Sequence, residues 1–219
     1  MFEVKKEIAK FINKKIITWY RQNGRDFLWR ETRDPYKVLV AELLLHQTFA
    51  RKVEPVYSLL ITKYPSPYHL SGASHKELED IIRPLGLLYR ADLLIKLAET
   101  IVGTYSGIVP DKLESLITLP GVGDYTSHAV LCFAYNYPVP VVDRNVIRVY
   151  KRFFSIETPL AKLNPTKKFW GSANSIVPKR AARDFNLGLL DFAALVCKHY
   201  SPTCGTCVLS KKCGSPGSN

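Results

Sequence analysis

The sequence lacks the features that would place it in a membrane or outside the cell. None of its 219 residues starts an uninterrupted apolar run of the ~18–20 residues that a membrane span requires. The N-terminus, MFEVKKEIAKFINKK, has neither the apolar core nor the small-residue cleavage site of a secretory signal. We therefore expect an intracellular, cytoplasmic protein. Cysteines rarely pair in that compartment, so the spacing of the five cysteines indicates metal binding, catalysis or packing.

Acidic residues are scarce relative to basic ones. The chain has 31 Lys+Arg against 19 Asp+Glu, a net charge of +12. Such an excess indicates a polyanionic partner, which DNA, RNA or an anionic membrane would supply. The charge is concentrated at the two ends, because residues 1–30 sum to +5, residues 31–136 to −2 and residues 137–219 to +9. We expect the two ends to fold together as one basic lobe beside a near-neutral middle lobe.

Strand patterns and internal repeats are also lacking. The β-branched run 139–142 is preceded by Pro138 and contains Pro140, which is typical of an extended connector. Apolar residues recur at three- and four-residue steps from Val4 to Tyr20, one face of a helix that ends near Asn23. Similar patterns predict helices over 36–49, 53–63, 75–82, 91–105, 112–118, 124–134 and 144–153. With 47% hydrophobic residues to form a core, we predict an all-α fold.

Four cysteines are concentrated near the C-terminus. Cys197, Cys204, Cys207 and Cys213 are spaced C-x6-C-x2-C-x5-C. Structural zinc sites usually pair two close-spaced couples, and this stretch has one CxxC. Four thiolates from one compact loop suit a [4Fe-4S] cluster, although a four-cysteine zinc knuckle or free thiols are the alternatives. Cys132, in the apolar stretch VLCFAY, is expected to pack in the core.

The surroundings of the four cysteines bear on what a cluster would do. Electron transfer is one possibility, but the chain has no motif for a flavin, haem or nicotinamide partner. Lys198, Lys211 and Lys212 flank the cysteines. A cluster that braces a basic loop against phosphates therefore fits the sequence better.

Two further stretches combine a turn or a carboxylate with the start of a helix. Residues 119–123, LPGVG, lie between two helical patterns. Their two glycines permit a tight turn with exposed N–H groups at a helix N-terminus, which predicts a phosphate-binding seat. Asp143 follows the extended run and precedes the basic helix of 144–153. It is expected to cap that helix, and its carboxylate could also stabilise positive charge or orient a water.

Taken in order, LPGVG, VVDRNVIRV and the cysteine loop resemble the helix-hairpin-helix DNA glycosylases with an iron-sulfur loop, the superfamily of endonuclease III and MutY. The resemblance extends from about Trp19 to Cys213. It implies a six-helix barrel lobe over 27–136, with the helix-hairpin-helix at about 112–134. It also implies a cluster lobe over 1–26 and 137–219, with the [4Fe-4S] loop at 197–213 and a DNA-binding cleft between the lobes. The implied partner is double-stranded DNA with a mismatched base, bound by a nucleoid-associated monomer.

The resemblance also implies the chemistry. Members that cut the DNA backbone carry a lysine two residues after LPGVG, because an amine forms the Schiff base; Tyr125 stands there. A monofunctional DNA glycosylase without lyase activity is therefore expected. Asp143 would stabilise the oxocarbenium-like sugar and guide the water. In the adenine branch, a glutamate at the position of Glu42 protonates the departing purine, so Glu42 would face the base cavity. Tyr125 would form one wall of the pocket that holds the flipped base.

DNA contacts follow from the same resemblance. Base flipping leaves a gap in the duplex, which Gln47 is expected to enter. Leu88 is the candidate for a second wedge, and Tyr89 is the alternative. Contacts to the DNA backbone are expected from the hairpin and from the basic residues near the cysteines: Gly121, Val122, Gly123, Arg144, Arg148, Lys198, Lys211 and Lys212.

The base that is removed is predicted from the branch that the chain resembles most. The stretches RDFNLGLLDFAALVC and VVDRNV, with Tyr125, resemble the archaeal thymine-DNA mismatch glycosylases, which favours thymine or uracil opposite guanine. The stretch RDFLWRETRDPYKVLVAELLLHQT is shared with the adenine branch, and His46 and Gln47 replace the arginines expected in thymine enzymes. Six residues follow Cys213, and we therefore expect the protein to lack the 8-oxoguanine-reading domain of that branch. An adenine glycosylase remains the alternative, and a non-catalytic iron-sulfur DNA-binding protein is the alternative of another class.

Overall fold

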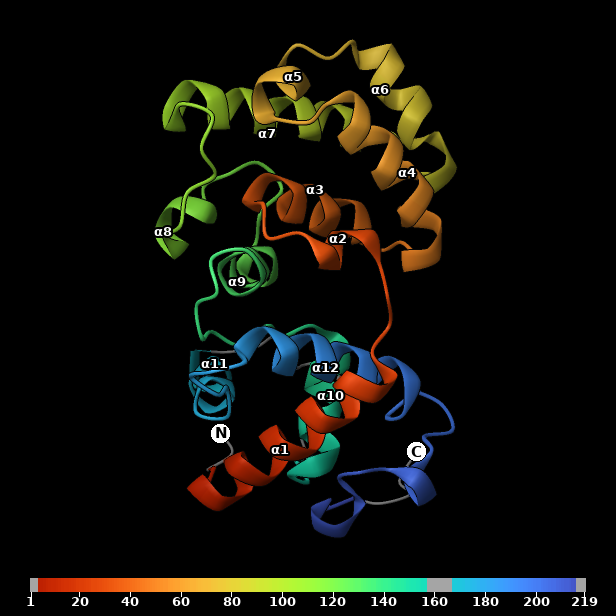
Figure 1. Ribbon diagram of the computed structural model, residues 1–219, viewed down its shortest axis with the longest axis vertical. Coiled ribbons are helices and arrows are strands. Elements are labelled where there is room, and N and C mark those ends of the chain that lie inside the picture. The colour runs from red at the N-terminus through yellow and green to blue at the C-terminus, as the bar shows by residue number, and fades with distance from the viewer. Residues whose placement is uncertain (1–3, 157–166, 216–219) are drawn as a thin grey trace. The chain divides into compact units, whose positions relative to one another are not determined.

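The computed structural model describes residues 4–156 and 167–215, and every regular element in these ranges is a helix (Figure 1). The all-α prediction is confirmed. None of the described helices is long and apolar enough to cross a membrane. Residues 1–3, 157–166 and 216–219 of the predicted cluster lobe lie outside the described residues.

The chain divides into two compact units. One joins Met1–Arg25 to Asn136–Asn219, and we call it the terminal unit. The other is the continuous stretch Asp26–Tyr135, which we call the middle unit. Each unit has its own core.

The middle unit is built around α3 (Pro35–Leu45), of which most residues are buried. Asp34 starts this helix, because its Oδ1 accepts hydrogen bonds from the backbone N–H of Tyr36 at 2.9 Å and of Lys37 at 3.3 Å. Helices α2, α4 and α9 contact α3, and α7 packs against α5 and α6. The remaining bounds are α2 (Leu28–Glu31), α4 (Ala50–Lys63), α5 (Pro67–Ser71), α6 (His75–Ile82), η1 (Arg83–Leu85), α7 (Arg90–Tyr105), α8 (Leu113–Leu116) and α9 (Asp124–Phe133).

The end of α3 differs from the sequence prediction. The apolar pattern predicted one helix over 36–49, but α3 ends at Leu45 and α4 begins at Ala50. Gln47 adopts a left-handed backbone conformation with φ of +55°, which is incompatible with a continuing α-helix. The short loop 46–49 therefore separates the two helices and presents Gln47 at the surface.

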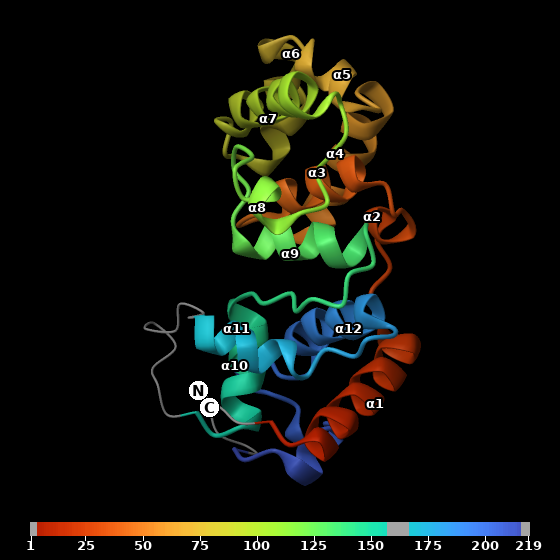
Figure 2. The same cartoon turned by 90° about the vertical axis from the view of Figure 1, so that its left-hand side faces the viewer.

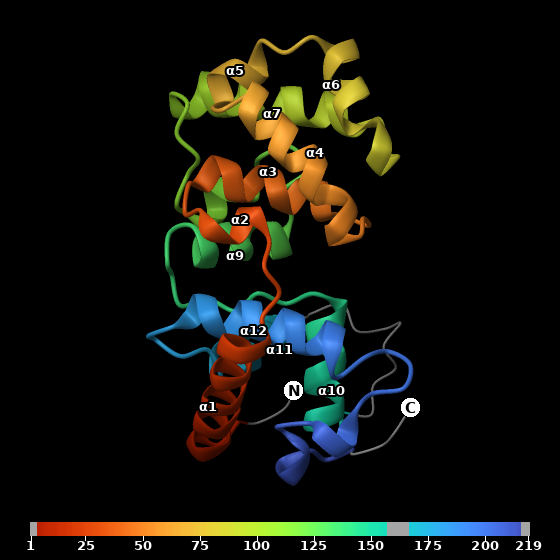
Figure 3. The ribbon, with the colours of Figure 1, turned by 45° about the vertical axis from the view of Figure 1, so that its right-hand side comes forward.

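The terminal unit packs α12 (Ala182–Leu195) against both α1 (Lys6–Asn23) and α10 (Arg144–Phe153) (Figure 3). Its core is apolar and aromatic, and Gly188 gives α1 room, because a Cβ there would lie 2.8 Å from the Cβ of Tyr20. The unit also contains α11 (Lys167–Asn174) and two short turns in the cysteine loop, η3 (Cys204–Thr206) and η4 (Ser210–Lys212).

A partly buried ion pair fastens the end of α1 to α12. The side chain of Asp191 is fully buried and accepts hydrogen bonds from the backbone N–H of Arg25 at 2.7 Å and from its Nε at 2.6 Å. A buried carboxylate requires such partners. The pair therefore fixes the point at which the chain leaves the terminal unit.

Candidate functional site

The LPGVG hairpin joins α8 to α9 in the middle unit (Figure 2). Gly121 has a φ of +76°, and a Cβ there would lie 2.7 Å from Cδ2 of Leu93, so both conformation and space require glycine. Gly123 occupies the N-cap of α9 without a side-chain cap, and space beside it is open. The N-terminal amides of α9 are thus accessible for the phosphate-binding role that the sequence predicts.

Val122 is one of the predicted DNA contacts. Its side chain is buried, and its backbone N–H donates to the carbonyl of Leu119 at 3.1 Å. Val122 therefore anchors the hairpin in the core of the middle unit, and its predicted DNA contact stays a prediction. The exposed part of the turn is Gly121 and Gly123.

Two of the predicted site residues lie on helices of the middle unit that pack together. Glu42 lies on α3 and is only 5% exposed, whereas Tyr125 lies in the first turn of α9 and is half-buried. Helices α3 and α9 are in contact. His46 Nε2 and Thr126 Oγ1 are 3.1 Å apart, which links the loop after α3 to the residue that follows Tyr125.

Histidines in this region are held neutral by burial. Burial lowers the pKa of His46, and the nearby positive charge of Arg90 lowers it further. Burial also lowers the pKa of His128 on α9, although its Nδ1 lies 2.7 Å from the carbonyl oxygen of Asp124. A neutral imidazole can either donate to the Thr126 hydroxyl or accept from it.

The predicted wedge residues occupy two exposed segments of the middle unit. Gln47 is exposed in loop 46–49. In the turn 86–89, Tyr89 is 61% exposed and Leu88 is half-buried. Exposure therefore favours Tyr89 over Leu88 for entering a duplex. Phe49, which sequence reasoning did not single out, is 81% exposed beside Gln47.

Asp143 is the N-cap of α10 in the terminal unit. Its Oδ1 accepts from the backbone N–H of Val146 at 2.7 Å, and its Oδ2 accepts from Nδ2 of Asn145 at 2.6 Å. The predicted cap is confirmed. Two donors fix the carboxylate in one orientation, and its side chain remains half-buried, which is compatible with a catalytic role.

Asn186 holds the extended segment that leads to Asp143, and sequence reasoning missed it. This residue of α12 is 1% exposed. Its Oδ1 accepts from the N–H of Val141 at 2.9 Å, and its Nδ2 donates to the carbonyl of Val139 at 3.0 Å. The amide thus acts as the partner that a neighbouring strand would provide. The one sequence signal was a lone polar residue within the apolar stretch 185–190.

The predicted basic contacts separate into exposed and buried residues. Arg144, Lys198, Lys211 and Lys212 are exposed, and Nζ of Lys212 lies 4.9 Å from the ring centroid of Phe11. These four residues remain candidates for phosphate contacts.

Arg148 is the buried residue among the predicted basic contacts. It is 6% exposed, and its guanidinium donates to the carbonyls of Ala193 at 2.8 Å and Cys197 at 3.0 Å and to Oδ1 of Asn145 at 2.8 Å. With its nitrogens engaged inside the unit, Arg148 supports the end of α12, and its predicted phosphate contact stays a prediction.

The four cysteines of the C-terminal loop form no disulfide and are half-buried. Burial raises the pKa of Cys207 and of Cys213, and neighbouring thiols of the set raise both pKa values further, so the sulfurs lie in one neighbourhood. Among the described residues, no group of three or more His, Cys, Asp or Glu side chains is already arranged around a metal position. Four clustered thiols are nonetheless the donor set that an iron-sulfur cluster takes. Cys132 is fully buried, as predicted.

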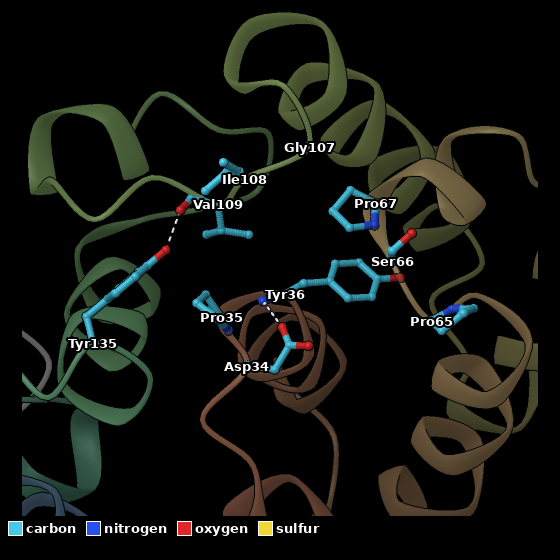
Figure 4. A pocket seen from close by; sticks show the side chains of 10 residues that line it. All are labelled: Asp34, Pro35, Tyr36, Pro65, Ser66, Pro67, Gly107, Ile108, Val109 and Tyr135. Atoms are coloured by element: carbon cyan, nitrogen blue, oxygen red, sulfur yellow. Dashed lines mark hydrogen bonds between the residues drawn. The ribbon is translucent and has the colours of Figure 1, made fainter.

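A pocket of about 280 Å³ lies elsewhere in the middle unit (Figure 4). It is lined by residues 34–36, 65–67 and 107–109 and by Tyr135. Tyr135 donates its hydroxyl to the carbonyl of Val109, and Tyr36 donates its hydroxyl to that of Tyr64 at 2.7 Å. The predicted site residues do not line this pocket, and its tyrosine hydroxyls have structural partners.

Comparisons with known proteins place these features in one group. Residues 40–171 match the family described as HhH-GPD superfamily base excision DNA repair protein. The chain is 43% identical to the thymine/uracil-DNA glycosylase of Pyrobaculum aerophilum, an alignment that covers 89% of this chain and 86% of that one. It is 40% identical to the thymine-DNA glycosylase of Aeropyrum pernix, with 92% of each chain covered. Identity to the adenine DNA glycosylase of Mycobacterium tuberculosis is 36%, over 89% of this chain and 64% of that protein.

Solved structures give the same grouping. A thermostable thymine-DNA glycosylase superposes with a TM-score of 0.89 at 38% identity, covering 94% of this chain and 95% of that one. A non-covalent endonuclease III-DNA complex superposes with a TM-score of 0.81 at 26% identity, covering 98% and 97%.

Proposed function

Because the chain belongs to the HhH-GPD superfamily of base excision DNA repair proteins, we propose that it is a monofunctional DNA glycosylase that removes thymine or uracil paired with guanine. The observation that carries this proposal is the identity of 43% and 40% to thymine/uracil- and thymine-DNA glycosylases over most of each chain. DNA is the partner, and we expect a monomer to bind it.

The reaction would break the bond between C1′ of the deoxyribose and the base nitrogen. Positive charge then develops on the sugar, and Asp143, its carboxylate oriented by Val146 and Asn145, would stabilise that charge. Water adds its oxygen to C1′ and loses one proton, and the departing base nitrogen takes up one proton, so the products are the free base and an abasic site. Asp143 is thus the proposed catalytic carboxylate.

Strand cleavage is not expected to accompany base removal. A lyase step needs an amine to form a Schiff base with the opened sugar. The corresponding position in the first turn of α9 is Tyr125, whose phenol cannot do so. We propose that Tyr125 walls the flipped base and that buried Glu42 forms a hydrogen bond with it.

Base flipping would be supported by the two exposed segments of the middle unit. Gln47 enters the gap, and Tyr89 is the second insertion residue that exposure favours, with Leu88 as the alternative. Gly121 and Gly123 at the start of α9, with Arg144, Lys198, Lys211 and Lys212, would hold the phosphates. Each true phosphate contact should add to the slope of log affinity against log salt.

We further propose that Cys197, Cys204, Cys207 and Cys213 hold a [4Fe-4S] cluster. The support is the spacing, the half-buried thiols and their mutual effect on the pKa values of Cys207 and Cys213. When bound, the cluster would cross-link the basic loop at four points. Iron and sulfide assays on the anaerobically purified protein should give about four of each per chain. Cys204→Ser should lose them and Cys132→Ala should keep them, whereas a colourless protein containing zinc would contradict the proposal.

One assay tests the proposed reaction. Labelled duplexes with G·T, G·U, G·A and 8-oxoG·A pairs are incubated with the protein and then treated with alkali, which cleaves abasic sites. Cleavage of the G·T and G·U duplexes, and only after alkali, is expected. Breaks that form without alkali would contradict the monofunctional assignment.

The second candidate function is adenine removal, favoured by the buried Glu42 and by the 36% identity to an adenine DNA glycosylase. Cleavage restricted to the adenine-containing duplexes would establish it. Binding without an alkali-labile product in any duplex would instead indicate a non-catalytic iron-sulfur DNA-binding protein.

A further inference from the structure

Arg90 is a buried arginine that neither the sequence motifs nor the proposed chemistry explain. It is 2% exposed and is the first residue of α7, directly after the turn that carries Leu88 and Tyr89. Arginine is rarely buried unless its charge and donors are satisfied. Its partners therefore indicate what it does.

The guanidinium of Arg90 holds the loop that carries Gln47. Nη1 donates to the carbonyl of Leu44 at 2.9 Å and to Oγ1 of Thr48 at 3.1 Å, and Nη2 donates to the carbonyl of His46. Carbonyls at the end of a helix lack a donor from the next turn. The planar fork of an arginine can reach three acceptors at once, which the single ammonium of a lysine cannot do in the same geometry.

These contacts bracket Gln47 on both sides. His46 and Thr48 are its chain neighbours, and Thr48 Oγ1 also donates to the carbonyl of His46 at 3.1 Å. Gln47 itself is exposed with a φ of +55°, a conformation that non-glycine residues adopt when their surroundings impose it. The clamp therefore supports the strained conformation that presents the Gln47 side chain.

The same residue ties down the second insertion segment. The backbone N–H of Arg90 donates to the carbonyl of Leu87 at 3.1 Å, which closes the turn carrying Leu88 and Tyr89. Through its side chain and its backbone, Arg90 thus joins loop 46–49 to the turn 86–89.

We propose that Arg90 is a positioning residue that fixes Gln47 and Tyr89 as one insertion unit, so that both enter the duplex in a single register when the base flips. The inference rests on the proposed glycosylase function and extends it to a residue that does not contact DNA. Because the effect passes through Gln47, the consequences of changing the two residues are coupled.

A double-mutant cycle tests this coupling. Arg90→Lys, Gln47→Ala and the double variant are compared with the unchanged protein in single-turnover excision from a G·T duplex. Misplacing Gln47 is expected to slow excision by about 10- to 100-fold in Arg90→Lys, and the double variant should be no slower than the slower single variant. Rates that multiply in the double variant would overturn the inference.

Base flipping is measured separately with the fluorescent base 2-aminopurine, placed beside the mismatch. The fluorescence of 2-aminopurine rises when the neighbouring base unstacks. Arg90→Lys should lose this rise while binding undamaged duplex as the unchanged protein does. Arg83→Lys is the matched control. Arg83 lies seven residues before Arg90, is exposed and pairs with Asp80. This variant should leave both the excision rate and the fluorescence rise unchanged.

A milder variant tests whether the effects of Arg90→Lys come only from loss of folding. Thr48→Val removes one acceptor while the guanidinium keeps its two carbonyls, and it should slow excision and reduce the fluorescence rise in the same direction but less than Arg90→Lys. A full fluorescence rise and rate in both variants would overturn the inference while leaving the proposed function intact. An unchanged protein that excises no base from any duplex would overturn the proposed function, and the inference with it.

Discussion

Each unit of the molecule contains a buried arginine that binds carbonyl oxygens at the end of a helix. In the middle unit, Arg90 binds the carbonyls of Leu44 and His46 at the end of α3. In the terminal unit, Arg148 binds those of Ala193 and Cys197 at the end of α12. Neither arginine lies near its acceptors in the sequence. A buried helix end needs donors from elsewhere, and both units meet this need with a guanidinium.

The loops that follow α3 and α12 differ in the interactions that hold them in addition to the buried arginine. Loop 46–49 is held by Arg90, by hydrogen bonds of Thr48 and by the contact of His46 with Thr126. The loop after α12 contains the four cysteines, so a cluster would give it a second means of support. The middle-unit loop should therefore respond more sharply to loss of its arginine.

The units also differ in charge. The terminal unit has 20 Lys+Arg and 6 Asp+Glu, a sum of +14, whereas the middle unit has 11 and 13, a sum of −2. The electrostatic attraction for DNA should therefore come from the terminal unit, while the middle unit supplies the proposed base cavity and insertion segments.

The largest expected effect concerns the carboxylate of the terminal unit. Asp143→Asn should slow excision from a G·T duplex by about 10²–10³-fold, because charge stabilisation at the sugar is lost. Asparagine is as good an N-cap as aspartate, so the melting temperature should change little. Single-turnover excision and thermal unfolding of the same preparation separate the two roles. Full activity in Asp143→Asn would contradict the proposed catalytic role of the terminal unit.

A smaller effect is expected on stability when the arginine of the terminal unit is removed. Arg148→Met should lower the free energy of unfolding by about 2–4 kcal/mol, because carbonyls of Ala193 and Cys197 lose their donors. Arg144→Met on the same helix is the control, since an exposed side chain should change stability by less than about 0.5 kcal/mol.

Urea unfolding of the iron-loaded and iron-free protein would sharpen the comparison of the two loops. If the cysteine loop has a second support, Arg148→Met should lose less stability when iron is bound. Equal losses in both forms would contradict that difference between the units.

The smallest expected effect is a pH dependence within the middle unit. The pKa of His46 is lowered in the fold by burial and by Arg90, so below about pH 6.5 the unfolded chain binds a proton that the folded chain does not. Its contribution to stability is complete above that pH and is lost as pH falls from about 6.5 toward the lowered pKa. His128 adds to the same trend, because its pKa is also lowered.

Unfolding free energies at pH 7.5 and pH 5.5 measure this dependence. His46→Gln should reduce the loss on acidification, because glutamine does not titrate. A loss of the same size in His46→Gln would assign the dependence to other groups.

Local patterns predicted part of this architecture. The apolar stripe of α1 and the cap at Asp143 are local features, and the sequence contained all that was needed to predict them. The end of α3 was predicted incorrectly, because Gln47 is held in its conformation by Arg90, more than forty residues away in the chain. Arg148 was read as a phosphate ligand because a basic helix near a proposed site suggests one, and only the fold shows its carbonyl partners. Asn186 was missed for the same reason.

The terminal unit is assembled from both ends of the chain, which has a consequence for synthesis. Helix α1 leaves the ribosome first, but α12, against which it packs, begins at Ala182. At roughly 5–20 residues per second, the apolar face of Ile12 and Ile16 waits on the order of ten seconds or more for its partner. The contiguous middle unit can complete its own contacts during that interval. The newly made chain thus passes through a stage in which the contacts of the middle unit can form while α1 still lacks α12.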